Sequence, residues 1–477
     1  MSAVTDIASI VDRRTPEFVA LSDAIWDHPQ LRWTEHDAVE RQIAVAEARG
    51  GRVTREIGGI PTAFCAEWGS EGPVIAFLGE YDALAGLSQE SGRPECTPDP
   101  ANPTGPGQGC GHHLLGAGSL LAAVSAAQYL AERDLPGRVR YYGCPAEEAA
   151  AGKSFMVKAG AFEDVDAAMT WHPNSHTATR QTRTLAYAQL YFRFRGIASH
   201  AGAAPHLGRS ALDAAELLNI GVNFLREHMP DTARIHYAFT DAGGESPNVV
   251  QERASIYYVV RAETVAEMRE LCERVSKVAE GAALMTETQL SIEFDGASAE
   301  ILPNEVLEAA LHRTVEELGP VPFDADDEET ARAFADTYNA KQLAEERLKA
   351  GLPRDDTRAL ADVVPPMDIA QPRPILTGST DVGDVSWVTP TVQILTSCLS
   401  MGTALHSWQF VAQGKLPAAH KGMAYSAKAI AGTALELFED PDLLARARDE
   451  FDKTVAVTPY DCPIPDDVTA PPLRRRG

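Results

Sequence analysis

The chain has 477 residues, of which 44% are apolar and 23% charged, a composition typical of a globular protein large enough for two full cores. Its 42 basic and 68 acidic residues give a formal net charge of −26, which excludes a protein that binds nucleic acid by neutralising phosphates. No apolar run has membrane-spanning or signal-peptide length, and the 7 cysteines have no paired spacing. We therefore expect reduced thiols, a cytoplasmic location and no membrane partner.

The first predicted elements alternate between helices and short apolar strands. Apolar spacing predicts helical structure over residues 15–50, with a break near residue 28, and a long small-residue helix over 111–133. The wholly apolar run 74–78 is typical of a buried parallel strand, and residues 139–144 and 165–171 predict two more. This alternation indicates an α/β domain whose mostly parallel, mixed sheet is flanked by helices.

The pattern changes near residue 186, where apolar and polar residues begin to alternate. Four alternating strands and two helices follow in the order β-α-β-β-α-β, which is that of the split βαβ unit: 188–195, 209–228, 234–240, 254–260, 265–284 and 290–294. We predict that residues 186–297 form an inserted ferredoxin-like α+β domain that serves for dimerisation and as a lid. The catalytic domain is then built from residues 1–185 and 298–477.

A glycine-rich loop before the long helix carries a thiol and an imidazole two residues apart, Cys110 and His112. Thiolate and imidazole are ligands for borderline-soft divalent metals. Carboxyl or imidazole groups also follow three predicted strands, where open α/β sheets place their sites. The proposed ligands are Cys110, His112, Glu148, His172 and His406. Because five N, O and S ligands exceed the needs of one tetrahedral ion, we expect two divalent ions, Zn²⁺ or Mn²⁺.

Glu147 is adjacent to the proposed ligand Glu148 and is our candidate for the general base that takes a proton from water. Each of these residues has an ordinary alternative when it is taken singly. A Glu-Glu pair is usually solvated surface, a buried histidine is usually a satisfied core residue, and a cysteine is often a small apolar residue. The joint placement after apolar strands favours the metal site.

Several motifs together resemble the co-catalytic metallo-amidohydrolases, the family of hippurate hydrolase and the auxin-conjugate amidohydrolases. They are C-G-H at 110–112, P-A-E-E at 145–148, the strand that leads to His172, and G-x-x-S-H-A-G-x-x-P-H-x-G at 196–208. The phrases TWHP, GSTDVGDVSW and HSWQ resemble the B-subunit type of aminobenzoyl-glutamate hydrolases within that family. The resemblance covers nearly the whole chain.

The resemblance implies a role for each matching residue. Asp82 orients a metal ligand, and His200 crosses to the partner subunit's site and stabilises the oxyanion. Two departures are Glu80, where the wider family has histidine, and His113, where many relatives have aspartate. The implied substrate contacts are Asn248, Arg261, Ser379, Thr380 and Asp381. The alternatives are a solvated surface arginine for Arg261 and a simple turn for the last three.

The resemblance implies an enzyme that cleaves the amide bond of an N-acyl or N-aroyl amino acid, with p-aminobenzoyl-glutamate as the first expected substrate. One alternative keeps the site but acts as a dipeptidase or on another aromatic amide, carbamate or aryl amine. A second alternative is a non-catalytic regulatory subunit of a paralogous hydrolase. We expect a homodimer through residues 186–297, in which a related A-type subunit could replace one copy.

Overall fold

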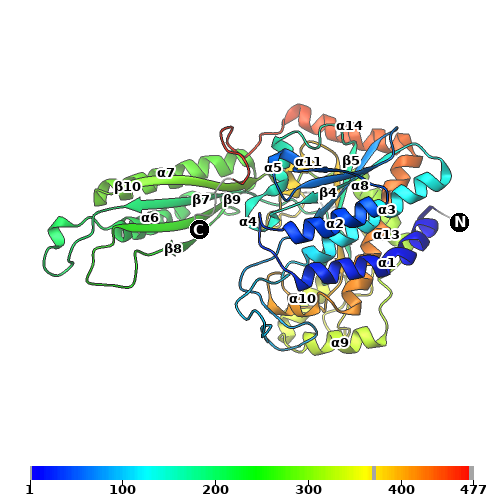
Figure 1. Cartoon of the computed structure of the whole chain (residues 1–477), viewed down its shortest axis with the longest axis horizontal. Helices are drawn as coiled ribbons and strands as arrows, with labels where there is room; N and C mark the ends of the chain where they lie inside the picture. The colour runs from blue at the N-terminus through cyan, green and yellow to red at the C-terminus, as the bar shows by residue number, and fades with distance from the viewer. Residues whose placement is uncertain (1–2, 368–371, 472–477) are drawn as a thin grey trace.

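The computed structural model describes residues 3–367 and 372–471, and it contains two β-sheets side by side (Figure 1). The larger sheet has seven strands in the order β1-β2-β4-β3-β5-β11-β6. Its central strands β4, β3, β5 and β11 are parallel, and the outer pairings are antiparallel. The strands are β1 (Arg52–Arg55), β2 (Phe64–Trp68), β3 (Val74–Glu80), β4 (Arg138–Cys144), β5 (Ala167–Asn174), β6 (Ala178–Thr179) and β11 (Thr391–Ser397). The predicted mixed, mostly parallel sheet is therefore confirmed.

Three helices, α1, α3 and α13, pack against one another beside the larger sheet. Helix α3 is apolar on nearly every face, as expected for a helix surrounded by core. Contrary to the expectation that no run has membrane-spanning length, α3 could cross a membrane by length and composition alone, but 83% of its apolar window is buried inside the structure. The remaining helices include α2 (His36–Ala48), α8 (Glu305–Leu318), α9 (Ala325–Ala335), α10 (Ala340–Lys349), α12 (Trp408–Gln413) and α14 (Pro441–Val457), and the central three are α1 (Ala3–Asp27), α3 (His112–Arg133) and α13 (Pro417–Glu439).

The smaller sheet has four antiparallel strands in the order β10-β7-β9-β8, and it is inserted in the chain between two parts of the larger sheet. On the central strands the alternating side chains behave as predicted, since Phe192, Phe194 and Ile256 are buried under two helices, whereas Phe239 of β8 and Ile292 of β10 are exposed. Its elements are β7 (Ala186–Arg195), α6 (Ala211–Leu225), β8 (Arg234–Asp241), β9 (Arg253–Ala262), α7 (Val265–Thr286) and β10 (Gln289–Ser298). This is the predicted β-α-β-β-α-β order.

The two sheets meet where β7 and β10 reach the larger sheet (Figure 1). There the guanidinium of Arg32 forms a 2.9 Å ion pair with buried Asp295, which also accepts a 2.6 Å hydrogen bond from Tyr257. The residues 379–381 lead directly into the short helix α11 (Val382–Ser386). Two further short helices, α4 (Glu147–Ala150) and α5 (Gly152–Lys158), follow β4 directly.

Candidate metal centre

The site lies at the carboxyl ends of β3, β4 and β5 and at the first turn of α3. Gly111, between Cys110 and His112, has a positive φ of 77°, and an added Cβ would lie 2.7 Å from the Phe410 ring and 2.9 Å from Pro173. Only glycine fits this left-handed, crowded position. The loop can therefore turn sharply and present the thiol and the imidazole to one point.

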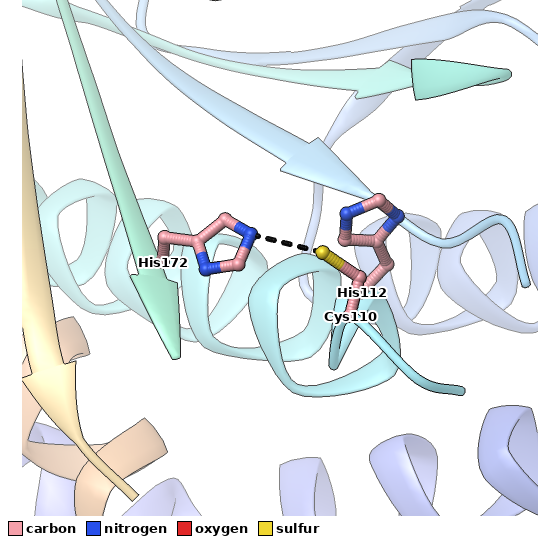
Figure 2. Close-up of side chains that lie close together, drawn as sticks. All are labelled: Cys110, His112 and His172. Atoms are coloured by element: carbon pink, nitrogen blue, oxygen red, sulfur yellow. Dashed lines mark hydrogen bonds between the residues drawn. The ribbon is translucent and has the colours of Figure 1, made fainter. Parts of the chain in front are cut away.

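Cys110, His112 and His172 form the first group of possible ligand atoms, all within 4.8 Å of one another. The thiol Sγ of Cys110 lies 3.4 Å from Nε2 of His172 (Figure 2). His172 lies within β5 rather than after it, while the other two residues come from the loop and the start of α3. Two segments separated by about sixty residues thus supply one group.

A second group of possible ligand atoms, also within 4.8 Å of one another, comes from Cys110, Glu148 and His406. Nε2 of His406 lies 3.3 Å from Oε2 of Glu148, and the His406 side chain is 52% exposed. Cys110 belongs to both groups, so its sulfur lies between two clusters of ligand atoms. All five predicted ligands are therefore brought together, in an arrangement suited to two neighbouring ions that share a ligand.

The two inner histidines are oriented by hydrogen bonds from Nδ1. Nδ1 of His112 donates to Oδ1 of Asp82 at 2.9 Å, and Oδ2 of Asp82 accepts from the Glu148 backbone at 2.8 Å. Nδ1 of His172 donates to the Pro173 carbonyl at 2.8 Å. Both rings therefore leave Nε2 free to bind a metal ion, which is the usual arrangement of metal-ligating histidines.

Two buried ligand atoms have no hydrogen-bond partner among the described residues: Nε2 of His112 and Oε1 of Glu148. Nε2 of His112 lies 3.2 Å from Oε2 of Glu80, but without the geometry of a hydrogen bond. Buried polar atoms are nearly always paired, because leaving one unpaired costs about 1–3 kcal/mol. Divalent ions held by the two ligand groups would satisfy these atoms. The thiol, imidazole and carboxylate groups present here are the ligand types of a zinc or manganese site, so the residues fit the expected group.

Burial and neighbouring charges shift the pKa values of the candidate ligands. Burial, with the charge of Glu148, raises the pKa of the Cys110 thiol well above its usual value. Burial also lowers the pKa of His172, helped by the neighbouring His112, to about 4. Burial would raise the pKa of Glu148, but its hydrogen bond with His406 and the charge of His112 bring it below the usual value. His172 is therefore neutral and Glu148 ionised at neutral pH, as metal ligands require, whereas the Cys110 thiol would have to release its proton on binding a metal ion.

Glu147 opens α4, one residue before the ligand Glu148. Its Oε2 lies 3.9 Å from Nε2 of His112, and these two residues form a third close group with Glu80. Burial raises the pKa of Glu147 well above its usual value, and the charges of Glu80, Asp381 and Glu148 add to this rise. The Glu147 carboxyl group thus faces the ligand cluster with an increased affinity for a proton.

A buried lysine at this edge was missed by sequence reasoning. Nζ of Lys153, on α5, lies 2.6 Å from Oε1 of Glu80 and 2.6 Å from Oδ1 of Asp381. The Lys153 backbone N–H also donates to the other Asp381 oxygen at 2.8 Å. The predicted pocket residue Asp381 is therefore held by Lys153. No local pattern around Lys153 in the sequence signals this contact, because both carboxylates come from distant segments.

The other predicted substrate contacts fall into two places. Arg261, on β9, is half-buried, and its Nη1 donates to Oγ of Ser379 at 2.6 Å, with Thr380 next along the chain. His200 and Asn248 are exposed on loops of the smaller sheet, where the Ala201 backbone donates to the Asn248 carbonyl at 2.9 Å. These loops lie at the end of that sheet away from the larger sheet (Figure 1). Within one chain, His200 and Asn248 therefore do not join the ligand cluster.

His113 is fully buried but lies outside the ligand groups. Its Nε2 donates to the Gly414 carbonyl at 3.0 Å, and burial lowers its pKa to about 3. It is therefore a neutral residue that joins α3 to the segment after α12. The position where many relatives have aspartate serves packing in this chain.

Comparison with known proteins agrees with this architecture. A family model for the M20 peptidase dimerisation domain matches residues 182–286. The chain is 44% identical to the B-subunit of the p-aminobenzoyl-glutamate hydrolase of Escherichia coli (strain K12), with 98% of each chain covered. It is 30% identical to the Xaa-Arg dipeptidase of Mus musculus, covering 93% of this chain and 91% of that one.

A solved structure shares the fold: a dinuclear metal-binding peptidase of the M20 family from Bacillus subtilis. It has a TM-score of 0.51 at 17% identity and covers 87% of this chain and 98% of that chain. The resemblance stated from the motifs is thus confirmed. Because the 44% identity extends over 98% of both chains, this protein belongs to the M20 family of amidohydrolases, enzymes that hydrolyse amide bonds.

Proposed function

We propose that this chain hydrolyses the amide bond of an N-aroyl amino acid, with p-aminobenzoyl-glutamate as the substrate. The observation that carries the proposal is the pair of ligand groups that share Cys110, with Glu147 beside them. The printed name of the 44% identical relative supports the choice of substrate. The chain retains a complete candidate ligand set and a candidate base, which disfavours the alternative of a non-catalytic regulatory subunit.

Two divalent ions, Zn²⁺ or Mn²⁺, held by Cys110, His112, Glu148, His172 and His406 would polarise the amide carbonyl and lower the pKa of water. Glu147 would accept the proton of the attacking water and pass it to the leaving amine, since its carboxyl group faces His112 at the cluster. Asp82 would keep His112 in the tautomer that leaves Nε2 free. Arg261 would hold a substrate carboxylate through its planar guanidinium.

The role that we propose for His200 requires a second subunit. Since His200 is exposed at the far end of the smaller sheet, it would reach the ligand cluster of a partner and donate a hydrogen bond to the oxyanion. The Asn248 carbonyl accepts a hydrogen bond from the backbone of Ala201, the residue after His200, so Asn248 would reach the partner's site together with His200. The match to a dimerisation domain supports a homodimer through residues 186–297, or a dimer with a related A-type subunit. The described cysteines are all free, which suits the cytoplasm.

A second candidate activity is that of a dipeptidase, because the Xaa-Arg dipeptidase is 30% identical over 93% of this chain. The two activities differ in the charge of the released amino acid. Arg261 has no carboxylate within ion-pair distance among the described residues. Burial lowers the pKa of Arg261, and the charge of Glu147 acts in the opposite direction, so the two groups interact. A cation at this position suits a substrate carboxylate, which both kinds of substrate carry, and it repels the second positive charge of an arginine side chain.

The test is a substrate panel on one purified sample whose metal content has been measured. We expect release of p-aminobenzoate from p-aminobenzoyl-glutamate, loss of activity after chelation, and recovery with Zn²⁺ or Mn²⁺. Xaa-Arg dipeptides should be turned over more slowly, as judged by kcat/KM. Faster turnover of the dipeptides would favour the second candidate, and activity that survives complete chelation would reject the metal-dependent mechanism.

A further inference from the structure

A second arginine near the site, Arg180, is not used by the proposed mechanism. It directly follows the short edge strand β6, and its backbone N–H donates to the Gln393 carbonyl of β11 at 2.9 Å. In the sheet register, Gln393 is opposite Thr170 of β5, two residues before His172. Because side chains alternate along a strand and paired residues share a face, Arg180 and His172 lie on the same face of the sheet.

Arg180 has only neutral partners among the described residues. Its Nη1 donates to the Gln393 side-chain oxygen, and its Nε donates to Oγ1 of Thr182 at 3.4 Å. The other buried cation at this edge, Lys153, differs, since it has carboxylates 2.6 Å away on both sides. An arginine that stays charged and half-buried without an anionic neighbour is costly unless a ligand supplies the anion.

The charge of Arg180 interacts with charged groups of the site. Burial lowers its pKa to about 10, and the charges of Glu147 and Glu80 act against that fall. Arg180 in turn helps to lower the pKa of His172. Arg261 also interacts with the charge of Glu147. The ligand cluster is thus flanked by two guanidinium groups, one from the larger sheet and one from the smaller sheet, and neither has a carboxylate partner among the described residues.

We propose that Arg180 binds the side-chain carboxylate of the acidic amino acid that the enzyme releases, and so selects glutamate over neutral or basic residues. This inference rests on the proposed function and deepens it. A glutamyl amide carries two carboxylates, and the site offers two guanidinium groups that have no carboxylate partner among the described residues. Arg261 accounts for the α-carboxylate that every aminoacyl substrate has, which leaves Arg180 for the carboxylate that distinguishes glutamate. A planar guanidinium suits a carboxylate better than a lysine does.

The test compares p-aminobenzoyl-glutamate with p-aminobenzoyl-glutamine, which has nearly the same shape but lacks the side-chain charge. The metal-loaded wild-type enzyme should prefer the glutamate substrate by about 10- to 100-fold in kcat/KM, the range expected for a hydrogen-bonded charge pair. In Arg180→Gln that preference should fall to within about threefold, with turnover of the glutamine substrate retained. Arg180→Lys keeps the positive charge but lacks the planar guanidinium, so its preference for the glutamate substrate should lie between those of the wild type and Arg180→Gln.

Arg183→Gln is the matched control, because Arg183 lies on the same segment but faces a carboxylate, Glu263, at 3.9 Å. It should leave the preference unchanged. Circular dichroism and the melting temperature of each variant check that it folds, and Arg180→Lys carries the test if Arg180→Gln does not fold. The inference would be overturned if the Arg180 variants kept the preference for the glutamate substrate, or if they lost the same factor in kcat/KM on both substrates. Neither result would affect the proposed function.

Binding measured in a Glu147→Gln background separates the inference from the proposed function. Calorimetry with metal-loaded Glu147→Gln should show tighter binding of p-aminobenzoyl-glutamate than of the glutamine compound, and adding Arg180→Gln should remove that difference. If the wild-type chain neither turns over nor binds p-aminobenzoyl-glutamate, both proposals are wrong. If it binds and hydrolyses that substrate but Arg180→Gln keeps the discrimination, only the assignment of Arg180 is wrong.

Discussion

At the scale of single residues, the site depends on which nitrogen of each imidazole is occupied. His112 and His172 both use Nδ1 for a hydrogen bond, to Asp82 and to the Pro173 carbonyl respectively. Each ring is thereby fixed in the tautomer whose Nε2 carries a lone pair. The Asp82 carboxylate also accepts the Glu148 backbone N–H, so this one side chain positions two proposed ligands.

We predict that Asp82→Ala weakens metal binding by about 10- to 100-fold, as is typical when the partner of a ligating histidine is lost. Without Oδ1 the His112 ring is free to rotate and to change tautomer, and the Glu148 backbone loses its acceptor. Competition against a chromogenic chelator measures the change in affinity. Asp37→Ala on α2, where the side chain is 39% exposed, provides a control that should bind metal normally. Unchanged affinity in Asp82→Ala would show that the tautomer is held by other contacts.

For Glu147 we predict that substitution by glutamine lowers kcat by about 100- to 10,000-fold, the usual contribution of a general base, with metal content unchanged. The amide has similar shape but cannot accept the proton. Metal analysis and kcat are measured on the same preparation. Loss of both together would indicate that Glu147 is a ligand instead, which its place in the group with Glu80 and His112 makes a concrete alternative.

At the scale of elements, α11 joins three separate parts of the chain through Asp384. This buried carboxyl group accepts hydrogen bonds from Ser154 of α5 at 2.5 Å, from the Ala299 backbone after β10 at 3.0 Å, and from Tyr460 at 2.6 Å. Burial raises its pKa to about 7, although the bonds from Ser154 and Tyr460 lower it in part. The folded chain therefore binds the Asp384 proton more tightly than the unfolded chain does.

The sign of the pH effect follows from this difference. The contribution of Asp384 to the free energy of unfolding is fully present below about pH 4 and is lost as the pH rises to about 7. We predict that Asp384→Asn, which does not titrate, gains stability relative to wild type over this interval, by about 4 kcal/mol in all. Calorimetric melting from pH 4 to pH 8 measures the difference. Asp449→Asn, at an exposed position of α14, is the control for the effect of the substitution itself. A stability difference between Asp384→Asn and wild type that does not change with pH would contradict the prediction.

At the scale of the whole molecule, the smaller sheet projects away from the ligand cluster and carries His200 and Asn248 on its far loops (Figure 1). A site that uses these residues needs two chains, as the match to a dimerisation domain suggests. The ion pair between Arg32 and Asp295 and the hydrogen bond between Arg261 and Ser379 hold the smaller sheet against the larger one. Each chain would then lend its outer loops to its partner while its own sheets stay in contact.

Complementation tests this arrangement. We predict that Glu147→Gln and His200→Ala homodimers are both weakly active, whereas a heterodimer of the two, isolated with two affinity tags, recovers about half of the wild-type kcat per dimer. One of its sites pairs an intact Glu147 with the partner's intact His200. A heterodimer as inactive as its parents would place His200 in the site of its own chain. A monomer in light scattering would exclude the cross-subunit role altogether.

The sequence by itself determined the parts of this protein that local patterns specify. Apolar runs such as 74–78 indicated the buried parallel strands, and strict alternation indicated the smaller sheet, because a side chain's place on a strand depends only on its parity. The five proposed ligands were recognisable as candidates because Cys110 and His112 stand in a glycine-rich loop, and Glu148 and His172 stand near the ends of predicted strands. The family was recognisable from motifs spread along the whole chain.

Only the tertiary structure decided which distant residues meet. Nothing near Lys153 in the sequence shows that its ammonium group lies between Glu80 and Asp381, and nothing near Arg180 shows that it shares a sheet face with His172. Such contacts depend on strand order and register, which join segments hundreds of residues apart, and on burial, which sets the charge each group carries. For this reason candidate ligands could be proposed from the sequence, whereas the charges around them required the fold.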